Sequence, residues 1–136
     1  MEPSEIVLKI ESSYGGFPNG IYLDTQAQEW ESDYFSPMTI EMIFGSEEVY
    51  KASVQCGFLY LSSSLAPYEE VAVIECYTSD KARLIAALFL ERDRQLSFLE
   101  ETQLKAYVEC HGRYVLYYRL ADGKRAKKAV RSLDWS

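Results

Sequence analysis

Histidine and cysteine are scarce in this sequence, which holds one histidine and three cysteines. Any site that depends on an imidazole, whether a nucleophile–base pair or a zinc centre, must therefore use His111. The cysteines, Cys56, Cys76 and Cys110, form no CxxC pair and no other metal-ligand spacing. An odd number of cysteines without a secretory signal is typical of reduced thiols in a cytosol-like compartment. We therefore expect no metal, no cofactor and a cytoplasmic location.

Long apolar runs and a targeting segment are also lacking. The longest unbroken apolar run, Leu84 to Leu90, has seven residues, whereas a helix needs about 20 to span a membrane. The first residues, Met1 to Glu5, are acidic and do not show the basic and then apolar pattern of a signal peptide. With 136 residues and an apolar fraction of 48%, the chain is expected to form one soluble domain without membrane contact.

Positive charge is in short supply except near the C-terminus. The whole chain carries 14 basic and 21 acidic residues, yet residues 117–136 carry six basic and two acidic side chains. Residues 1–116 therefore have a net charge of −11, within a total of −7. A body this acidic repels phosphate groups and attracts basic partners. Nucleic acid is accordingly an unfavourable partner, and a protein with a basic surface is a favourable one.

The second half of the chain holds the clearest structural signals. An apolar run, Val71–Ile74, predicts a buried strand. Thr78 or Ser79 can then cap a helix over about 79–92. The apolar stripe of this helix consists of Leu84, Ile85, Leu88 and Phe89. Two further strands, over 105–110 and 113–120, are expected to form a hairpin around His111.

The remaining elements follow from shorter patterns. Alternating apolar residues predict strands over 5–11, 21–23, 37–44 and 49–61. Residues 96–99 fit a helix or a strand equally well. Residues 124–133 predict an amphipathic helix with cations on one face. The predicted fold is a single α+β domain over residues 1–136. A mostly antiparallel sheet is packed by one central helix (about 79–92), with a C-terminal amphipathic helix (about 124–133).

No residue is predicted to be catalytic. His111 is expected to be a turn residue at the tip of the hairpin, and Cys110 beside it should point to the opposite face. Carboxylates occur in adjacent pairs, but neighbouring residues rarely face each other, so these pairs are expected to be solvated surface charge. The pairs are Glu47-Glu48, Glu69-Glu70 and Glu100-Glu101.

Two surfaces are candidates for binding a partner. Acidic and aromatic residues alternate over 29–35, where rings can supply buried area and carboxylates can steer a basic partner. Alternatively, this is an irregular segment whose aromatics cover one end of the core. The cationic face of the last helix is either solvated, or docks an acidic neighbour, including a second copy, or contacts nucleic acid, which is the weakest of these alternatives. The aromatic loop over 14–20 lacks the spacing of a phosphate-binding loop but is a possible contact surface. The candidate residues are Tyr14, Phe17, Glu29, Trp30, Glu31, Asp33, Tyr34, Lys124, Lys128 and Arg131.

These observations favour a small acidic protein-binding or inhibitory module. Toxin-neutralising proteins, secretion chaperones and phage-encoded regulators share this profile of size and charge, which is an analogy only. The alternative is a small-molecule-binding domain or an enzyme with a pocket between sheet and helix. Tyrosines converging there with Cys110 or His111 would indicate it. Self-association into a homo-oligomer, basic helix on acidic body, is the third alternative.

Overall fold

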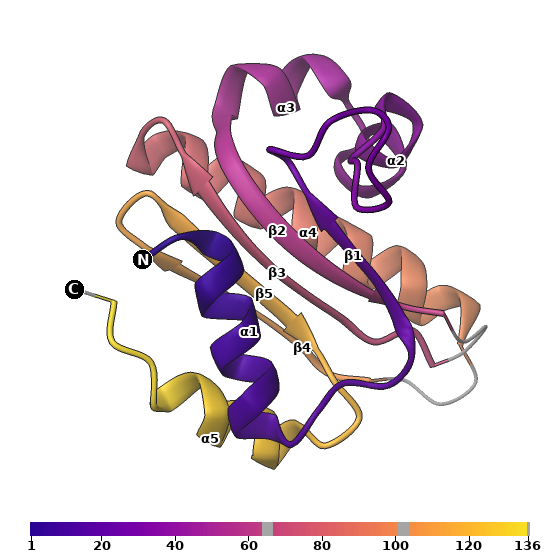
Figure 1. Ribbon diagram of the computed structural model, residues 1–136, viewed down its shortest axis with the longest axis vertical. Coiled ribbons are helices and arrows are strands. Elements are labelled where there is room, and N and C mark those ends of the chain that lie inside the picture. Colours follow the sequence, from indigo (N-terminus) through magenta and orange to yellow (C-terminus); the bar gives the residue numbers. More distant parts are fainter. Residues whose placement is uncertain (64–66, 101–103, 136) are drawn as a thin grey trace.

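The computed structural model describes residues 1–63, 67–100 and 104–135, and its strands form one antiparallel sheet (Figure 1). The strands are β1 (Gly20–Asp24), β2 (Val54–Ser62), β3 (Glu70–Cys76), β4 (Ala106–His111) and β5 (Tyr114–Arg119). Their order across the sheet is β1-β2-β3-β5-β4, so β1 and β4 are the two edges. The predicted α+β class with a mostly antiparallel sheet is confirmed.

Helices cover both faces of the sheet, which gives the molecule three layers (Figure 1). On one face lie α1 (Pro3–Tyr14) and α5 (Gly123–Arg131). On the other lie α2 (Pro37–Phe44), α3 (Glu47–Ser53) and α4 (Ser79–Leu99). The central strand β3 is therefore covered twice: Val71 and Val73 face α1 and α5, and Ala72 and Ile74 face α4. This double burial explains why the sequence of β3 is a continuous apolar run.

The central helix begins where the sequence predicts but extends further. Thr78 Oγ1 accepts the backbone N–H of Lys81 at 3.1 Å and caps α4. Ile85 and Phe89 are fully buried, as the predicted stripe requires, whereas Leu84 is 41% exposed. The helix continues to Leu99, so residues 96–99 belong to it. The predicted hairpin and C-terminal helix are confirmed as β4–β5 and α5.

The predicted strand over 5–11 is wrong, because this segment forms α1. Ile6 and Ile10 fit both the strand period and the helix period, and Leu8, the residue that distinguishes them, is 50% exposed. Pro3 at the first helical position favours the helix start, where the Glu2 N–H donates to Glu5 Oε1 at 3.5 Å. The residues that start the helix therefore distinguish it from a strand, whereas the alternating apolar pattern does not.

The predicted strand over 37–44 is also wrong, and the strand predicted over 49–61 begins only at Val54. Ser36 Oγ accepts the Thr39 N–H at 3.2 Å and starts α2. Ser46 Oγ accepts the Val49 N–H at 3.1 Å and starts α3. In α2 the buried residues are Ile40, Ile43 and Phe44. Their spacing is helical, so β-branched residues that suit a strand are buried here on one side of a helix.

The cap of α4 is testable by a pair of neighbouring substitutions. Thr78→Ala removes the acceptor of the Lys81 N–H and should lower the free energy of unfolding by about 1 kcal/mol in chemical denaturation. Ser79→Ala, one residue later in the first turn, leaves that bond intact and should change stability by only a few tenths of that. Equal losses in the two variants would contradict the assignment of the cap.

Candidate functional site

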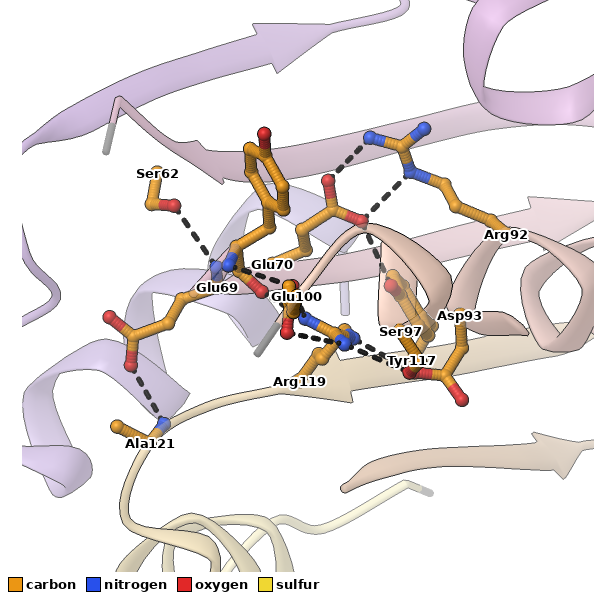
Figure 2. Close-up of polar contacts among 11 residues, drawn as sticks. Ser62, Glu69, Glu70, Arg92, Asp93, Ser97, Glu100, Tyr117, Arg119 and Ala121 are labelled. Carbon is orange, nitrogen blue, oxygen red and sulfur yellow. Dashed lines mark hydrogen bonds and ion pairs between the residues drawn. The ribbon is translucent and has the colours of Figure 1, made fainter. Parts of the chain in front are cut away.

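A buried polar cluster lies between α4 and the sheet, where the sequence predicts none (Figure 2). Glu69, Glu70 and Glu100, predicted to be solvated, are 7%, 3% and 7% exposed. The prediction holds for Glu47 and Glu48, which stay near the surface, while Glu101 lies outside the described residues. Adjacent glutamates indeed point apart: Glu69 accepts the N–H of Ala121, whereas Glu70 turns toward α4.

Arg119 is the centre of this cluster and is fully buried. Its Nε donates to Asp93 Oδ1 at 2.8 Å. Nη1 donates to the Tyr68 carbonyl at 2.5 Å and to Glu100 Oε1 at 2.7 Å. Nη2 donates to Ser97 Oγ at 3.1 Å and to Glu100 Oε2 at 3.0 Å. Burial alone would lower the pKa of Arg119, but the two carboxylates outweigh burial and raise it. All five N–H groups of the guanidinium are thus used.

Glu70 forms the second centre of the cluster. Arg92 donates to both of its carboxylate oxygens, at 2.8 and 2.6 Å, and the Tyr117 hydroxyl donates at 2.8 Å. Burial, reinforced by the Glu70 charge, raises the pKa of Tyr117 well above its ordinary value. Among the described residues, the one buried side-chain polar atom without a partner is Ser53 Oγ, outside the cluster. With its donors already paired internally, the cluster fastens the C-terminal half of α4 to β3 and β5.

Removing Arg119 should therefore be costly. Arg119→Met leaves the carboxylates of Asp93 and Glu100 without their cation and should lower the free energy of unfolding by about 3–5 kcal/mol. The double variant Arg119→Met/Glu100→Met should recover part of that loss, because no uncompensated Glu100 charge is left inside. Arg94→Met breaks the exposed pair with Glu91 and should leave the midpoint of the same denaturation experiment almost unchanged, because solvent screens this pair. If Arg119→Met lowered the free energy of unfolding no more than Arg94→Met does, the cluster would not be what fastens α4 to the sheet.

The cysteines and the histidine do not form a joint site. Cys110 Sγ lies 3.9 Å from the Ala82 carbonyl on the α4 side, while His111 stacks on Trp135 on the other side, so the predicted opposite orientation is confirmed. All three cysteines are free. Among the residues described, no group of three or more His, Cys, Asp or Glu side chains is arranged to hold a metal ion.

Thiol reactivity should differ among the three cysteines. Burial raises the pKa of the Cys56 and Cys76 thiols to about 12, so at neutral pH both are protonated and poorly nucleophilic. Cys110 is exposed. We expect iodoacetamide to modify Cys110 first and Cys76 only after unfolding, as followed by mass spectrometry of peptides. Modification of Cys76 in the folded protein at the rate of Cys110 would contradict this.

A groove of about 480 Å³ lies between the edge strand β4 and α5. Aromatic rings form its walls: His111 stacks on Trp135 at 4.3 Å, and Tyr107 stacks on Tyr118 at 5.1 Å. Lys127 Nζ lies 4.4 Å from the centre of the Tyr107 ring, a cation–π contact. Here the C-terminal tail returns to the sheet, and the Trp135 ring packs against His111 and Tyr114. The groove is thus lined by aromatic rings on the side of the strands and by cations along α5.

The polar groups in this groove pair with each other. Glu109 Oε1 lies 3.1 Å from His111 Nε2, and its other oxygen accepts the Tyr118 hydroxyl at 3.5 Å. Burial and the Glu109 charge raise the pKa of Tyr118 to about 12, so it remains a neutral donor at neutral pH. The residues that the sequence did not single out are Tyr107, Glu109, Tyr118 and Lys127. Alternation along β4 places residues 107, 109 and 111 on one face of the sheet. This pattern in the sequence could have predicted that they line one wall of the groove.

The segment 25–35, here named the acidic loop, is held to the sheet by hydrogen bonds. Asp24 donates its N–H to the Asp33 carbonyl at 2.8 Å. Thr25 donates its N–H to the Gly57 carbonyl at 3.1 Å, and its hydroxyl accepts the Gly57 N–H at 2.7 Å. Phe35 is buried in the core. One end of this segment therefore covers the core, and the rest forms a loop of defined shape at the end of β1.

The predicted contact residues divide into three groups. Glu29, Trp30 and Glu31 are exposed, Trp30 by 82%, while Asp33 and Tyr34 are half-buried on the same loop. Lys124, Lys128 and Arg131 are exposed on α5, and Arg131 lines the groove beside β4.

Two residues of the aromatic loop do not belong with the others. Tyr14 is 4% exposed, and its hydroxyl accepts the Asp122 N–H at 3.2 Å. Phe17 is half-buried, with its ring 4.6 Å from that of Tyr60. Both precede β1, whereas the acidic loop follows it, so the strand separates the two sets (Figure 1). Tyr14 must therefore be removed from the contact surface, because its burial in the core leaves almost no area for a partner.

The acidic loop and the edge of β1 enclose an open hollow of about 630 Å³. It is lined by Gly20, Ile21, Tyr22, Glu31, Ser32 and Asp33. Because the Asp24 N–H points outward to Asp33, alternation along an antiparallel strand turns the N–H and C=O of Tyr22 outward as well. Such outward groups on an edge strand are able to pair with an additional extended chain.

Comparisons with family models, with curated proteins and with solved structures find no match to this chain. Of the helices in the described ranges, none combines the length and the apolar character needed to cross a bilayer.

Proposed function

We propose that this chain is a small acidic protein-binding module of the cytoplasm, in which the acidic loop receives a basic surface of a partner protein. By binding, the chain would mask the basic surface of its partner, as an inhibitor or a chaperone does. The observation that carries the proposal is Trp30, whose side chain is 82% exposed between the carboxylates of Glu29 and Glu31. Tryptophan is one of the three residue types enriched at the energetic centres of protein interfaces, with tyrosine and arginine.

The ordered backbone of the loop supports this proposal. A tryptophan side chain offers about 150–250 Å² for burial. The hydrogen bonds from Asp24 and Thr25 to neighbouring segments already fix the loop, so binding has little backbone freedom left to remove. The carboxylates beside Trp30 steer a cationic partner and discriminate against an acidic one.

The edge of β1 extends the proposed surface. Tyr22 presents a peptide N–H and C=O beside Glu31 and Asp33. An extended segment of a partner is able to pair with these groups while its lysines and arginines approach the carboxylates. Ile21, which is 53% exposed, adds apolar area at the same place.

The proposal is tested by selecting peptides from a random displayed library on the intact protein. We expect the enriched peptides to carry lysine or arginine together with apolar residues. Trp30→Ala/Asp33→Lys should weaken their binding by about 30-fold or more, which corresponds to the loss of one interface centre of about 2 kcal/mol.

The matched control is Phe98→Ala/Asp80→Lys, which removes an exposed ring and reverses an exposed acid on α4. This variant should bind the peptides as the unmodified protein does. Peptides without basic residues, or equal binding to Trp30→Ala/Asp33→Lys when circular dichroism shows it to be folded, would overturn the proposal.

A small-molecule-binding domain or an enzyme is the second candidate. The groove beside β4 favours it, because His111, Tyr107 and Tyr118 converge there. Against it, Glu109 already holds both His111 and Tyr118, and Cys110 faces the other side of the sheet. Protein binding through the acidic loop is therefore the better-supported function.

A further inference from the structure

The acidic loop and the groove beside β4 lie at opposite edges of the sheet. The strand order β1-β2-β3-β5-β4 places β1, with its loop, at one end and β4 at the other. Figure 1 shows the same separation, with α5 and the C-terminus on the side of the molecule away from α2 and the loop before it. One copy of the chain therefore cannot bring its own loop to its own groove, but two copies can join edge to edge.

The charges of the two surfaces are complementary. Lys127 and Arg131 line the groove, and Lys124 and Lys128 extend the same cationic helix. Lys124, Lys128 and Arg131 are exposed, and the Lys127 ammonium lies over the Tyr107 ring. The loop offers Glu29 and Glu31, both exposed. The α5 side of the groove thus carries the charge that the loop lacks, while Glu109 on the strand side is already held by His111 and Tyr118.

The shapes and apolar content of the two surfaces also correspond. Trp30 projects from the loop, whereas the groove is a concavity whose walls include Val130, Leu133 and Trp135. An exposed ring that enters an aromatic and apolar groove, with carboxylates meeting cations at the rim, has the anatomy of an interface centre.

We propose that the acidic loop of one copy docks into the β4–α5 groove of a second copy, with Trp30 inside the groove and Glu29 and Glu31 facing Lys127 and Arg131. The inference rests on the proposed function, since it uses the same loop and names the chain itself as a carrier of the basic surface. The contact is heterologous: after two copies join, one loop and one groove are left over. Association therefore continues to longer assemblies, and a partner that binds the loop competes with it.

Sedimentation equilibrium tests the contact with the full-length chain. At about 0.05 M salt the weight-average mass should rise with concentration past twice the 15.6 kDa of one chain, and at about 0.5 M salt it should return toward 15.6 kDa, because salt screens the rim charges. Glu48→Lys/Asp80→Lys, which reverses two exposed acids elsewhere, should still associate. A mass of 15.6 kDa at every concentration and salt would overturn the inference.

Two complementary variants separate this contact from a symmetric one. Glu29→Lys/Glu31→Lys disables the loop, and Lys127→Gln/Arg131→Gln disables the groove, so each variant alone should remain a monomer. Mixed in equal amounts, they retain one intact loop and one intact groove and should form a dimer that does not grow further. Association of either variant alone, or no dimer in the mixture of folded variants, would overturn the inference.

The outcome can be told apart from failure of the proposed function. If the chain stays monomeric while selected basic peptides still bind to Trp30 and Asp33, only the choice of a second copy as partner is wrong. If the peptides bind without the loop, the proposed function itself is wrong.

Discussion

The guanidinium group of Arg119 is inside the protein. A buried charge of this kind is tolerated only when groups of opposite charge and hydrogen-bond acceptors are buried beside it. Most of those partners lie at the end of α4, where Asp93, Ser97 and Glu100 accept four of the five N–H groups, and the Tyr68 carbonyl accepts the fifth. The helix must therefore continue to Leu99 rather than end at the polar residues near position 92. The same bonds fix the end of β5, from which the chain turns through Asp122 into α5. The position of the cationic helix thus depends on a charge cluster that is itself closed to ligands.

The sequence predicted well wherever its signals were local. The cap at Thr78 or Ser79, the apolar run of β3, the β4–β5 hairpin and the amphipathic α5 are all visible in residues within a few positions of each other. The helices α1 and α2 were missed because short segments with several β-branched residues satisfy strand and helix periods together, and α3 was missed because its seven residues run directly into β2. In these segments the decisive information is at the start, in Pro3, Ser36 and Ser46, and not in the apolar pattern.

The buried glutamates show why the polar cluster could not be predicted from the sequence. Glu70 meets Arg92 and Tyr117, which are 22 and 47 positions away. Glu69 meets the backbone of Ala121, at a distance of 52 positions. The residues next to Glu69 and Glu70 in the sequence give no sign of these distant contacts. A buried pair of adjacent glutamates therefore looks the same in the sequence as a solvated pair. The acidic loop was different, because a tryptophan between two glutamates is recognisable without its tertiary partners, and Trp30 is exposed.

Charge asymmetry along a chain ordinarily leads to pairing within the folded molecule, but here the sheet prevents it. Four strand spacings of about 4.8 Å separate the β1 edge from the β4 edge, or about 19 Å. This exceeds the Debye length of about 8 Å at physiological ionic strength, so exposed charges at the two edges scarcely attract each other within one copy. The attraction between the cations of α5 and the carboxylates of the acidic loop therefore adds little to folding stability. Because neither set is neutralised by the other, each is left able to gain an electrostatic interaction by contact with another molecule, and the proposed assembly of copies would join the two sets without any change in the fold.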